Sequence, residues 1–189
     1  MKNSIVIQAS QWIQGLTPPK IDLVYFCETR DVFQARLDRM TMELLKTSCG
    51  ENQTYLLTAI AGEIGNNSFD HNIGNWPDVA GIFFGSDFSA DKKYIVLADR
   101  GQGILTTLKK AKPELQDDIQ ALKTAFTEKI SGRTPENRGN GLKFVLQTVQ
   151  ELKIHLTFQS GLAQAELNEE IIIQKTDNPI HGCFALLKF

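Results

Sequence analysis

Hydrophobic residues recur at intervals of three and four in three stretches of the chain, and this spacing places their side chains on one face of an α-helix. The first stretch covers about residues 29–48 and is followed by Gly50, a residue that favours the end of a helix. The second covers about residues 52–69, and the third begins at Leu142. These stretches predict three amphipathic helices.

Other stretches are rich in β-branched and aromatic residues, which favour β-strands. Residues 79–84 and 94–98 are two such runs, and the polar segment between them predicts an antiparallel hairpin. After residue 152, apolar and polar positions alternate in the runs 153–158, 170–174 and 181–189. This alternation predicts three or more further strands.

The first 28 residues follow no single period. Residues 4–9 form a short β-like run, Pro18 and Pro19 interrupt the chain, and residues 21–26 form a second apolar run that predicts an edge strand or a lead-in. We therefore expect a lead-in segment over residues 1–28 and one domain over residues 29–189.

The composition is that of a globular protein. A chain of 189 residues with 42% hydrophobic residues can bury a sizeable core. With 20 basic and 22 acidic residues, the net charge of −2 shows no footprint for nucleic acid or a membrane surface. The N terminus does not resemble a signal peptide, and the three cysteines lack zinc-site or disulfide spacing, so we expect a reducing cytoplasm.

The second predicted helix changes character along one face. Leu56, Ile60, Glu63, Asn67 and Asp70 fall on one narrow stripe, which begins apolar and becomes polar. Glu63 and Asn67 are one turn apart, so an amide oxygen could ligate a hard cation while the carboxylate takes a proton. The alternative is an exposed polar stripe where the helix ends in a loop.

Two glycine-rich segments follow elements of regular structure. The strand at 94–98 leads into Asp99-Arg-Gly101-Gln-Gly103, and Arg138-Gly139-Asn-Gly141 opens the helix at Leu142. Glycines before a helix leave backbone N–H groups open to an anion. Either segment alone could be a plain turn, and neither has Rossmann or P-loop spacing. Their order after the Glu63 stripe is what favours a nucleotide site.

In this order, the motifs resemble the ATP-binding domain of the gyrase, histidine kinase and MutL (GHKL) superfamily. The resemblance covers about residues 30–189. It implies the α+β Bergerat fold, a two-layer α/β sandwich with a mixed, mostly antiparallel sheet and helices on one face. It also implies that the protein binds ATP and Mg²⁺.

The resemblance assigns a role to each motif. Asn67 would ligate Mg²⁺, and Asp99 would accept a hydrogen bond from the adenine amino group. The glycines after Asp99 would let the backbone approach the base, residues 105–138 would form the ATP lid, and the amides of residues 139–142 would hold the phosphates. The matched positions are Glu63, Asn67 and His71 in the N box, Asp99, Gly101 and Gly103 in the first glycine box, and Gly139, Gly141 and Leu142 in the second.

Several neighbouring residues have more than one interpretation. His71 would contact a phosphate, carry a proton or face solvent, and Arg138 is a candidate phosphate clamp. Cys183 stands where the family usually has a hydroxyl residue, so the sequence departs from the pattern there. The remaining charged residues near the motifs are expected to be solvated or structural: Arg100, Lys129 and Arg133 as solvated charges, and His155 and His181 as strand residues.

Within the superfamily, the layout resembles the freestanding anti-sigma-factor kinases. No histidine precedes His71, so the phosphoacceptor hairpin of histidine kinases is not expected, nor is a transducer domain. The resemblance implies an ATP-dependent protein kinase that acts on a separate protein partner, with Glu63 as the base. Two alternatives remain: a nucleotide-gated binding module without significant turnover, and the catalytic half of a split histidine kinase. A homodimer is compatible with each of them.

Overall fold

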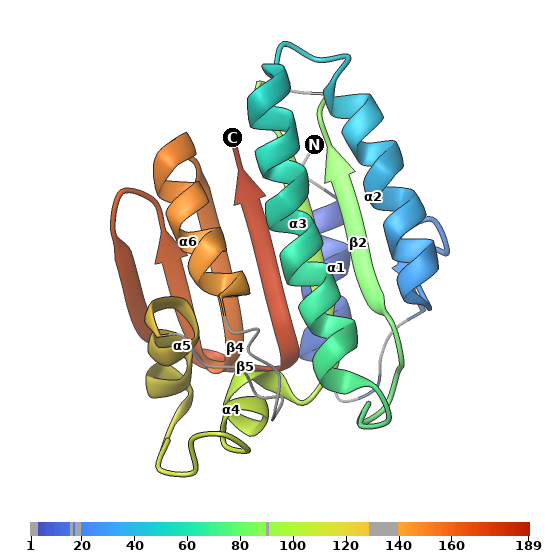
Figure 1. Ribbon diagram of the computed structural model, residues 1–189. Helices are drawn as coiled ribbons and strands as arrows, with labels where there is room; N and C mark the ends of the chain where they lie inside the picture. The colour runs from blue at the N-terminus through green and yellow to red at the C-terminus, as the bar shows by residue number, and fades with distance from the viewer. Residues whose placement is uncertain (1–3, 16, 18–19, 90, 129–139) are drawn as a thin grey trace.

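The computed structural model describes the chain except residues 1–3, 16, 18–19, 90 and 129–139. It is an α+β sandwich built on a five-stranded sheet with strand order β1-β2-β3-β5-β4 (Figure 1). All four strand pairs are antiparallel. The helices are α1 (Ser4–Gln14), α2 (Arg30–Leu44), α3 (Glu51–Asn72), α4 (Gly103–Leu108), α5 (Asp118–Thr127) and α6 (Gly141–Leu152), and the strands are β1 (Phe26–Cys27), β2 (Ile82–Asp87), β3 (Tyr94–Asp99), β4 (His155–Leu167) and β5 (Ile171–Lys188).

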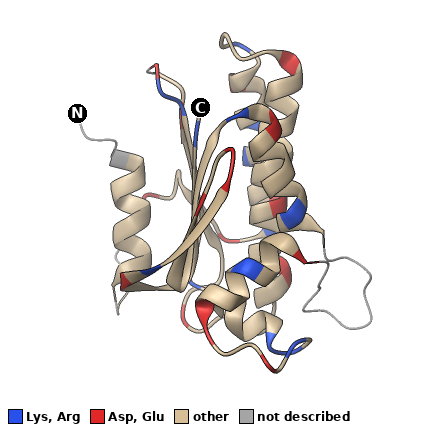
Figure 2. Ribbon diagram, turned by 90° about the vertical axis from the view of Figure 1, so that its left-hand side faces the viewer, with Lys and Arg blue, Asp and Glu red and all other residues tan. Residues whose placement is uncertain are grey.

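The expected α+β sandwich is confirmed, and α1 adds a feature to it. Helices α2 to α6 lie on one side of the sheet, whereas α1 lies alone on the other (Figure 2). The main core fills the space between the sheet and α2, α3, α5 and α6, with Phe33, Ile60 and Phe126 fully buried. A second cluster joins α1 to the opposite face of the sheet. The expectation that all helices lie on one face of the sheet was therefore wrong, because α1 lies on the other face.

The prediction of a strand over residues 4–9 was wrong, because this segment begins α1. Ile5, Ala9, Trp12 and Ile13 are buried and follow helical spacing, which places them on the face that meets the sheet. The β-branched residues Ile5 to Ile7 favour a strand locally, but burial of this face outweighs that preference. The expected lead-in segment therefore contains an integral helix.

The predicted helices at 29–48 and 52–69 are confirmed as α2 and α3. The side chain of Thr29 caps α2 by accepting a hydrogen bond from the Val32 N–H at 3.3 Å. Helix α3 has 22 residues and reaches Asn72, three residues beyond the expected end. Throughout the described part of the chain, the helices are too short or too polar to cross a membrane.

The predicted hairpin is confirmed as β2 and β3. Asp99 is the last residue of β3 and lies in the sheet between Ile82 of β2 and Cys183 of β5. The middle of β3 is buried on both faces, under α3 on one side and α1 on the other. The residues that follow Asp99 therefore emerge from the centre of the molecule.

The three β-runs expected after residue 152 lie within two long strands, β4 and β5. Strand β4 doubles back near Gly161, where φ is 56° and the pairing register shifts. His155 Nε2 lies 2.9 Å from Glu166 Oε2 although both residues belong to β4. An extended strand would hold them about 35 Å apart, so the contact requires the reversal.

The segment expected to form a lid, residues 105–138, contains more fixed structure than a lid requires. The sequence of this segment allows one helix near residues 114–129, and α5 lies there, while α4 was not predicted. Phe126 of α5 is fully buried and packs edge-on against Phe158 of β4, with ring centroids 5.4 Å apart. This packing makes α5 part of the main core. The rest of the expected lid, from residue 129, lies outside the described residues.

Candidate functional site

A cleft lies where the C-terminal half of α3, the end of β3, α4 and the start of α6 converge. Helices α3 and α6 run side by side on the helical face, and α4 lies near their lower ends (Figure 1). The space within the cleft is about 370 Å³ when its open mouth is included. Its lining residues are Ile64, Asn67, Ser68, His71, Asn72, Asp99, Gly103, Ile104, Thr107, Leu142, Phe158 and Cys183.

Asp99 is the buried carboxylate of this cleft, with 2% of its surface exposed. The Ser68 hydroxyl donates to Oδ2 at 2.7 Å, and the Gly101 N–H donates to Oδ1 at 2.8 Å. Burial raises the pKa of Asp99 from 3.8 to about 6, against the opposing effect of these hydrogen bonds. Each carboxylate oxygen can accept a further hydrogen bond, so Asp99 can still receive one from a ligand.

Close packing fixes the turn that follows Asp99. The Asn72 side chain of α3 accepts a hydrogen bond from the Gln102 N–H at 2.8 Å and donates to the Ser68 carbonyl at 2.8 Å. A Cβ atom at Gly101 would clash with this Asn72 side chain. Gly182, with φ of 68°, lies equally close, since its Cβ would be 2.5 Å from the Gly101 nitrogen. Glycine at both positions lets β5 and α3 approach the turn.

Glu63 and Asn67 lie beside the first turn of α6. A Cβ atom at Gly141 would lie 2.5 Å from Glu63 Oε2 and 3.3 Å from Asn67 Nδ2. Gly141 is the first residue of α6, so free N–H groups and the positive end of the helix dipole face this region. Glu63 is exposed at the rim, whereas Asn67 is half-buried in the cleft. The Glu63 carboxylate and the Asn67 amide are therefore both close to the start of α6, a helix end that can bind an anion.

His71 lines the cleft one turn beyond Asn67. Burial lowers the pKa of His71, and the positive charge of Lys110 lowers it further. The side chain is half-buried, so the fully solvent-facing alternative does not hold. A neutral imidazole can donate or accept a hydrogen bond in the cleft.

Ser160 supplies a hydroxyl close to the Cys183 thiol. Its Oγ lies 3.7 Å from Cys183 Sγ, accepts from the Ile104 N–H at 2.9 Å and donates to the Gly182 carbonyl at 3.1 Å. Burial, together with the nearby Asp99 carboxylate, raises the pKa of Cys183 well above its ordinary value. Cys183 is consequently a neutral thiol, and Ser160 ties β4 to α4 and β5.

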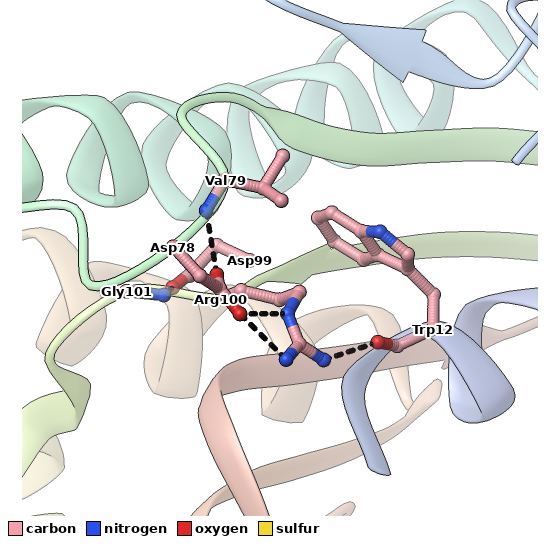
Figure 3. Close-up of polar contacts among 6 residues, drawn as sticks. All are labelled: Trp12, Asp78, Val79, Asp99, Arg100 and Gly101. Carbon is pink, nitrogen blue, oxygen red and sulfur yellow. Dashed lines mark hydrogen bonds and ion pairs between the residues drawn. The ribbon is translucent and has the colours of Figure 1, made fainter. Parts of the chain in front are cut away.

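The expectation that Arg100 is a solvated charge was wrong. Its side chain is fully buried on the α1 side of the sheet, where Nη2 lies 2.6 Å from Asp78 Oδ2 (Figure 3). Nε donates to the same oxygen at 2.8 Å, and Nη1 donates to the Trp12 carbonyl at 2.5 Å. Burial would raise the pKa of Asp78, but the Arg100 contacts outweigh it and hold this pKa below its ordinary value. The side chains of Asp99 and Arg100, neighbours in sequence, thus lie on opposite faces of the sheet.

The structure brings together most of the residues singled out in the sequence. Five of them line the cleft: Asn67, His71, Asp99, Gly103 and Leu142. Glu63 and Gly141 meet at its rim, while Gly101 faces a separate hollow beside Gln102. Arg138 and Gly139, as well as Lys129 and Arg133, lie outside the described residues. Sequence reasoning missed Ser68, Asn72 and Ser160, although the first two lie on the Asn67 helix four and eight residues after Ile64.

A metal ion would depend on few protein ligands here. Among the described residues, no group of three or more His, Cys, Asp or Glu side chains is arranged to hold a metal. Mg²⁺ is commonly bound by one or two protein oxygens together with substrate phosphates. Asn67 at the cleft is compatible with that mode of binding.

Comparison with known proteins gives no family assignment. The chain matches no protein-family model, and a search of curated protein sequences found no significant match.

Proposed function

We propose that this protein binds ATP with Mg²⁺ and regulates a separate protein partner, as a kinase similar to histidine kinases and anti-sigma-factor kinases. The observation that carries the proposal is Asp99, a buried carboxylate at a cleft whose other end meets the start of a helix. One end suits a base with an exocyclic amine, and the other suits phosphates. Three free cysteines favour a reducing compartment, and we propose the cytoplasm.

Asp99 supports an adenine nucleotide in particular. At neutral pH a carboxylate with a pKa of about 6 is mostly ionised and accepts hydrogen bonds only. The adenine amino group is a donor, whereas guanine presents an oxygen at the equivalent position. The apolar walls given by Ile64, Ile104 and Phe158 suit a flat ring. The cleft should therefore favour ATP over GTP.

The region around Gly141 supports phosphate binding. The free N–H groups in the first turn of α6 can hold an anion, and the lack of a Cβ at Gly141 leaves room for the Glu63 carboxylate beside them. Asn67 would hold Mg²⁺, which neutralises phosphate charge when bound. Glu63, on the same side of α3, would accept the proton of a substrate hydroxyl.

A nucleotide-gated binding module is the second candidate. Within the described part of the chain, no hydrogen bond orients the Glu63 carboxylate, and the side chain is exposed. A general base is most effective when a neighbour holds it in position. The second candidate therefore retains the ATP site and omits efficient phosphotransfer.

Calorimetric titration with Mg-ATP and Mg-GTP tests the proposed site. Wild-type protein should bind ATP, and Asp99→Asn should weaken it about 10- to 150-fold, the usual loss for a hydrogen bond to a charged group. GTP should bind wild type at least as weakly as ATP binds the variant. Asp87→Asn, at the far end of the neighbouring strand β2, is the matched control and should bind ATP like wild type. Equal ATP affinity for wild type and Asp99→Asn would remove Asp99 from the site.

A further inference from the structure

Helix α1 ends on a buried positive charge, the side chain of Arg100, which directly follows strand β3. Trp12 lies in the last turn of α1, where backbone carbonyls lack helical partners and carry the negative end of the dipole. The Arg100 guanidinium donates to the Trp12 carbonyl at 2.5 Å and is itself fully buried (Figure 3). Arg100 therefore acts as a charged cap for the C terminus of α1.

Apolar contacts fix the same end of the helix. The Trp12 ring is 1% exposed and lies 6.4 Å from both Phe26 and Phe83, measured between ring centroids. Ala9, one turn earlier, is fully buried against the sheet. Among the described residues, α1 packs mainly against β2, β3 and β5, on the face of the sheet opposite to α2–α6 (Figure 2).

We propose that the docking of α1 regulates the cleft, because it holds the Asp99-Arg100-Gly101 backbone from the face opposite to the ligand. Asp99 faces the cleft and Arg100 faces α1, so one short segment is anchored on both sides of the sheet. When α1 is docked, Arg100 is fixed by the Trp12 carbonyl and by Asp78. When α1 leaves, Arg100 keeps its contacts with Asp78 but loses the Trp12 carbonyl, so the turn after Asp99 loses one of its supports.

The consequence is a thermodynamic link between two opposite faces of the protein. A preorganised Asp99 binds its ligand without the cost of ordering the turn. Docking of α1 then strengthens ligand binding, and ligand strengthens the docking of α1 by the same factor. A partner that takes hold of α1 would lower the affinity of the cleft. This regulation rests on the proposed nucleotide site, but the link between α1 and the Asp99 turn can be measured without nucleotide.

The test places a charge on the buried side of α1. Ala9→Glu puts a carboxylate into the apolar contact with the sheet, whereas Gln11→Glu adds the same charge to the exposed side as a matched control. Trp12 fluorescence reports undocking in a Trp76→Phe background, which leaves Trp12 as the one tryptophan. Hydrogen exchange of the Gly101 N–H, which donates to Asp99, reports the state of the turn.

We expect a red shift of Trp12 emission, faster exchange at Gly101 and at least about five-fold weaker Mg-ATP binding in Ala9→Glu, with no change in Gln11→Glu. Undocking with unchanged Gly101 exchange and unchanged ATP affinity would overturn the link. Faster Gly101 exchange in a protein that binds no nucleotide would support the link and overturn the proposed function instead. If Ala9→Glu does not fold, Ala9→Ser provides the milder substitution, and the same three measurements decide the result.

Discussion

The Asp99 carboxyl should make the stability of the protein depend on pH in a direction opposite to that of most carboxyls. Burial raises its pKa in the folded protein from 3.8 to about 6. Well below pH 3.8 the group is protonated in both the folded and the unfolded chain. Between pH 4 and pH 6 the folded protein keeps a proton that the unfolded chain has lost. The free energy of unfolding should therefore fall as the pH rises through this interval.

The size of the effect follows from the two pKa values. The interval from 3.8 to about 6, at roughly 1.4 kcal/mol per pH unit, corresponds to about 3 kcal/mol. Little of this is lost to solvent screening, because Asp99 is 2% exposed. Three kcal/mol is a substantial part of the 5–15 kcal/mol by which native proteins are typically stable.

Urea unfolding of wild type and Asp99→Asn between pH 4 and pH 7.5 measures this effect. Other groups titrate in both proteins, so the difference between the two unfolding free energies isolates position 99. Wild type should lose about 2 kcal/mol relative to the variant from pH 4 to pH 7, because part of the titration of the unfolded chain lies below pH 4. A constant offset adds to this, since Asn can accept from the Gly101 N–H but places an NH₂ group where Asp99 Oδ2 accepts from the Ser68 hydroxyl. A difference that is flat or rises with pH would refute the burial argument.

Asp87→Asn is a control of opposite sign. Hydrogen bonds from the Ser89 hydroxyl and N–H lower the pKa of Asp87 in the folded protein. Its contribution to stability is present at neutral pH and is lost as the pH falls through its folded pKa. The difference between wild type and Asp87→Asn should therefore increase with pH over the acidic range.

Three further predictions concern the cleft and its surroundings. Asn67→Ala should abolish the Mg²⁺ dependence of ATP binding, measured by calorimetry with and without Mg²⁺, and a large drop in melting temperature without ligand would instead indicate a structural role for Asn67. Glu63→Ala should retain ATP affinity but lower phosphate transfer about 10²–10⁴-fold if the protein is a kinase, and a variant as active as an active wild type would exclude Glu63 as the base. Phe126→Ala should cost about 3–5 kcal/mol in urea unfolding, against little change for the exposed Ile172→Ala, and a loss below 1 kcal/mol would mean that α5 is a detachable lid after all.

The site could be predicted from the sequence to the extent that its signals are local. The spacing of Glu63, Asn67 and His71 lies within one helix, and the structure places all three on the side of α3 that meets the cleft or its rim. The glycines at 101, 103 and 141 are required by close approach of other segments, and this requirement is visible as a glycine in the sequence. Signals of this kind involve residues that are close in sequence, so they can be read before the fold is known.

The missed features depend on contacts between distant residues. Arg100 follows an aspartate in a turn, and nothing near it indicates that its partner is the Trp12 carbonyl, 88 residues earlier. Ser160 lies in a strand that gives no sign of its bond to the Ile104 N–H. For α1, a signal did exist: Ile5, Ala9, Trp12 and Ile13 have helical spacing, but three consecutive β-branched or aliphatic residues at its start obscured it.

The pairing of Asp99 with Cys183 has a consequence for synthesis of the chain. Strand β3 has β2 on one side early in translation, but the strand on its other side, residues 183–188, is made long after it. A nascent chain can therefore form α3 and the β2–β3 hairpin on the ribosome, while the packing of Gly182 and Cys183 against Asp99 is still missing. A ligand can assist folding only after Gly182 and Cys183 have left the ribosome. Until then, an apolar edge of β3 is open to chaperones or to other nascent chains.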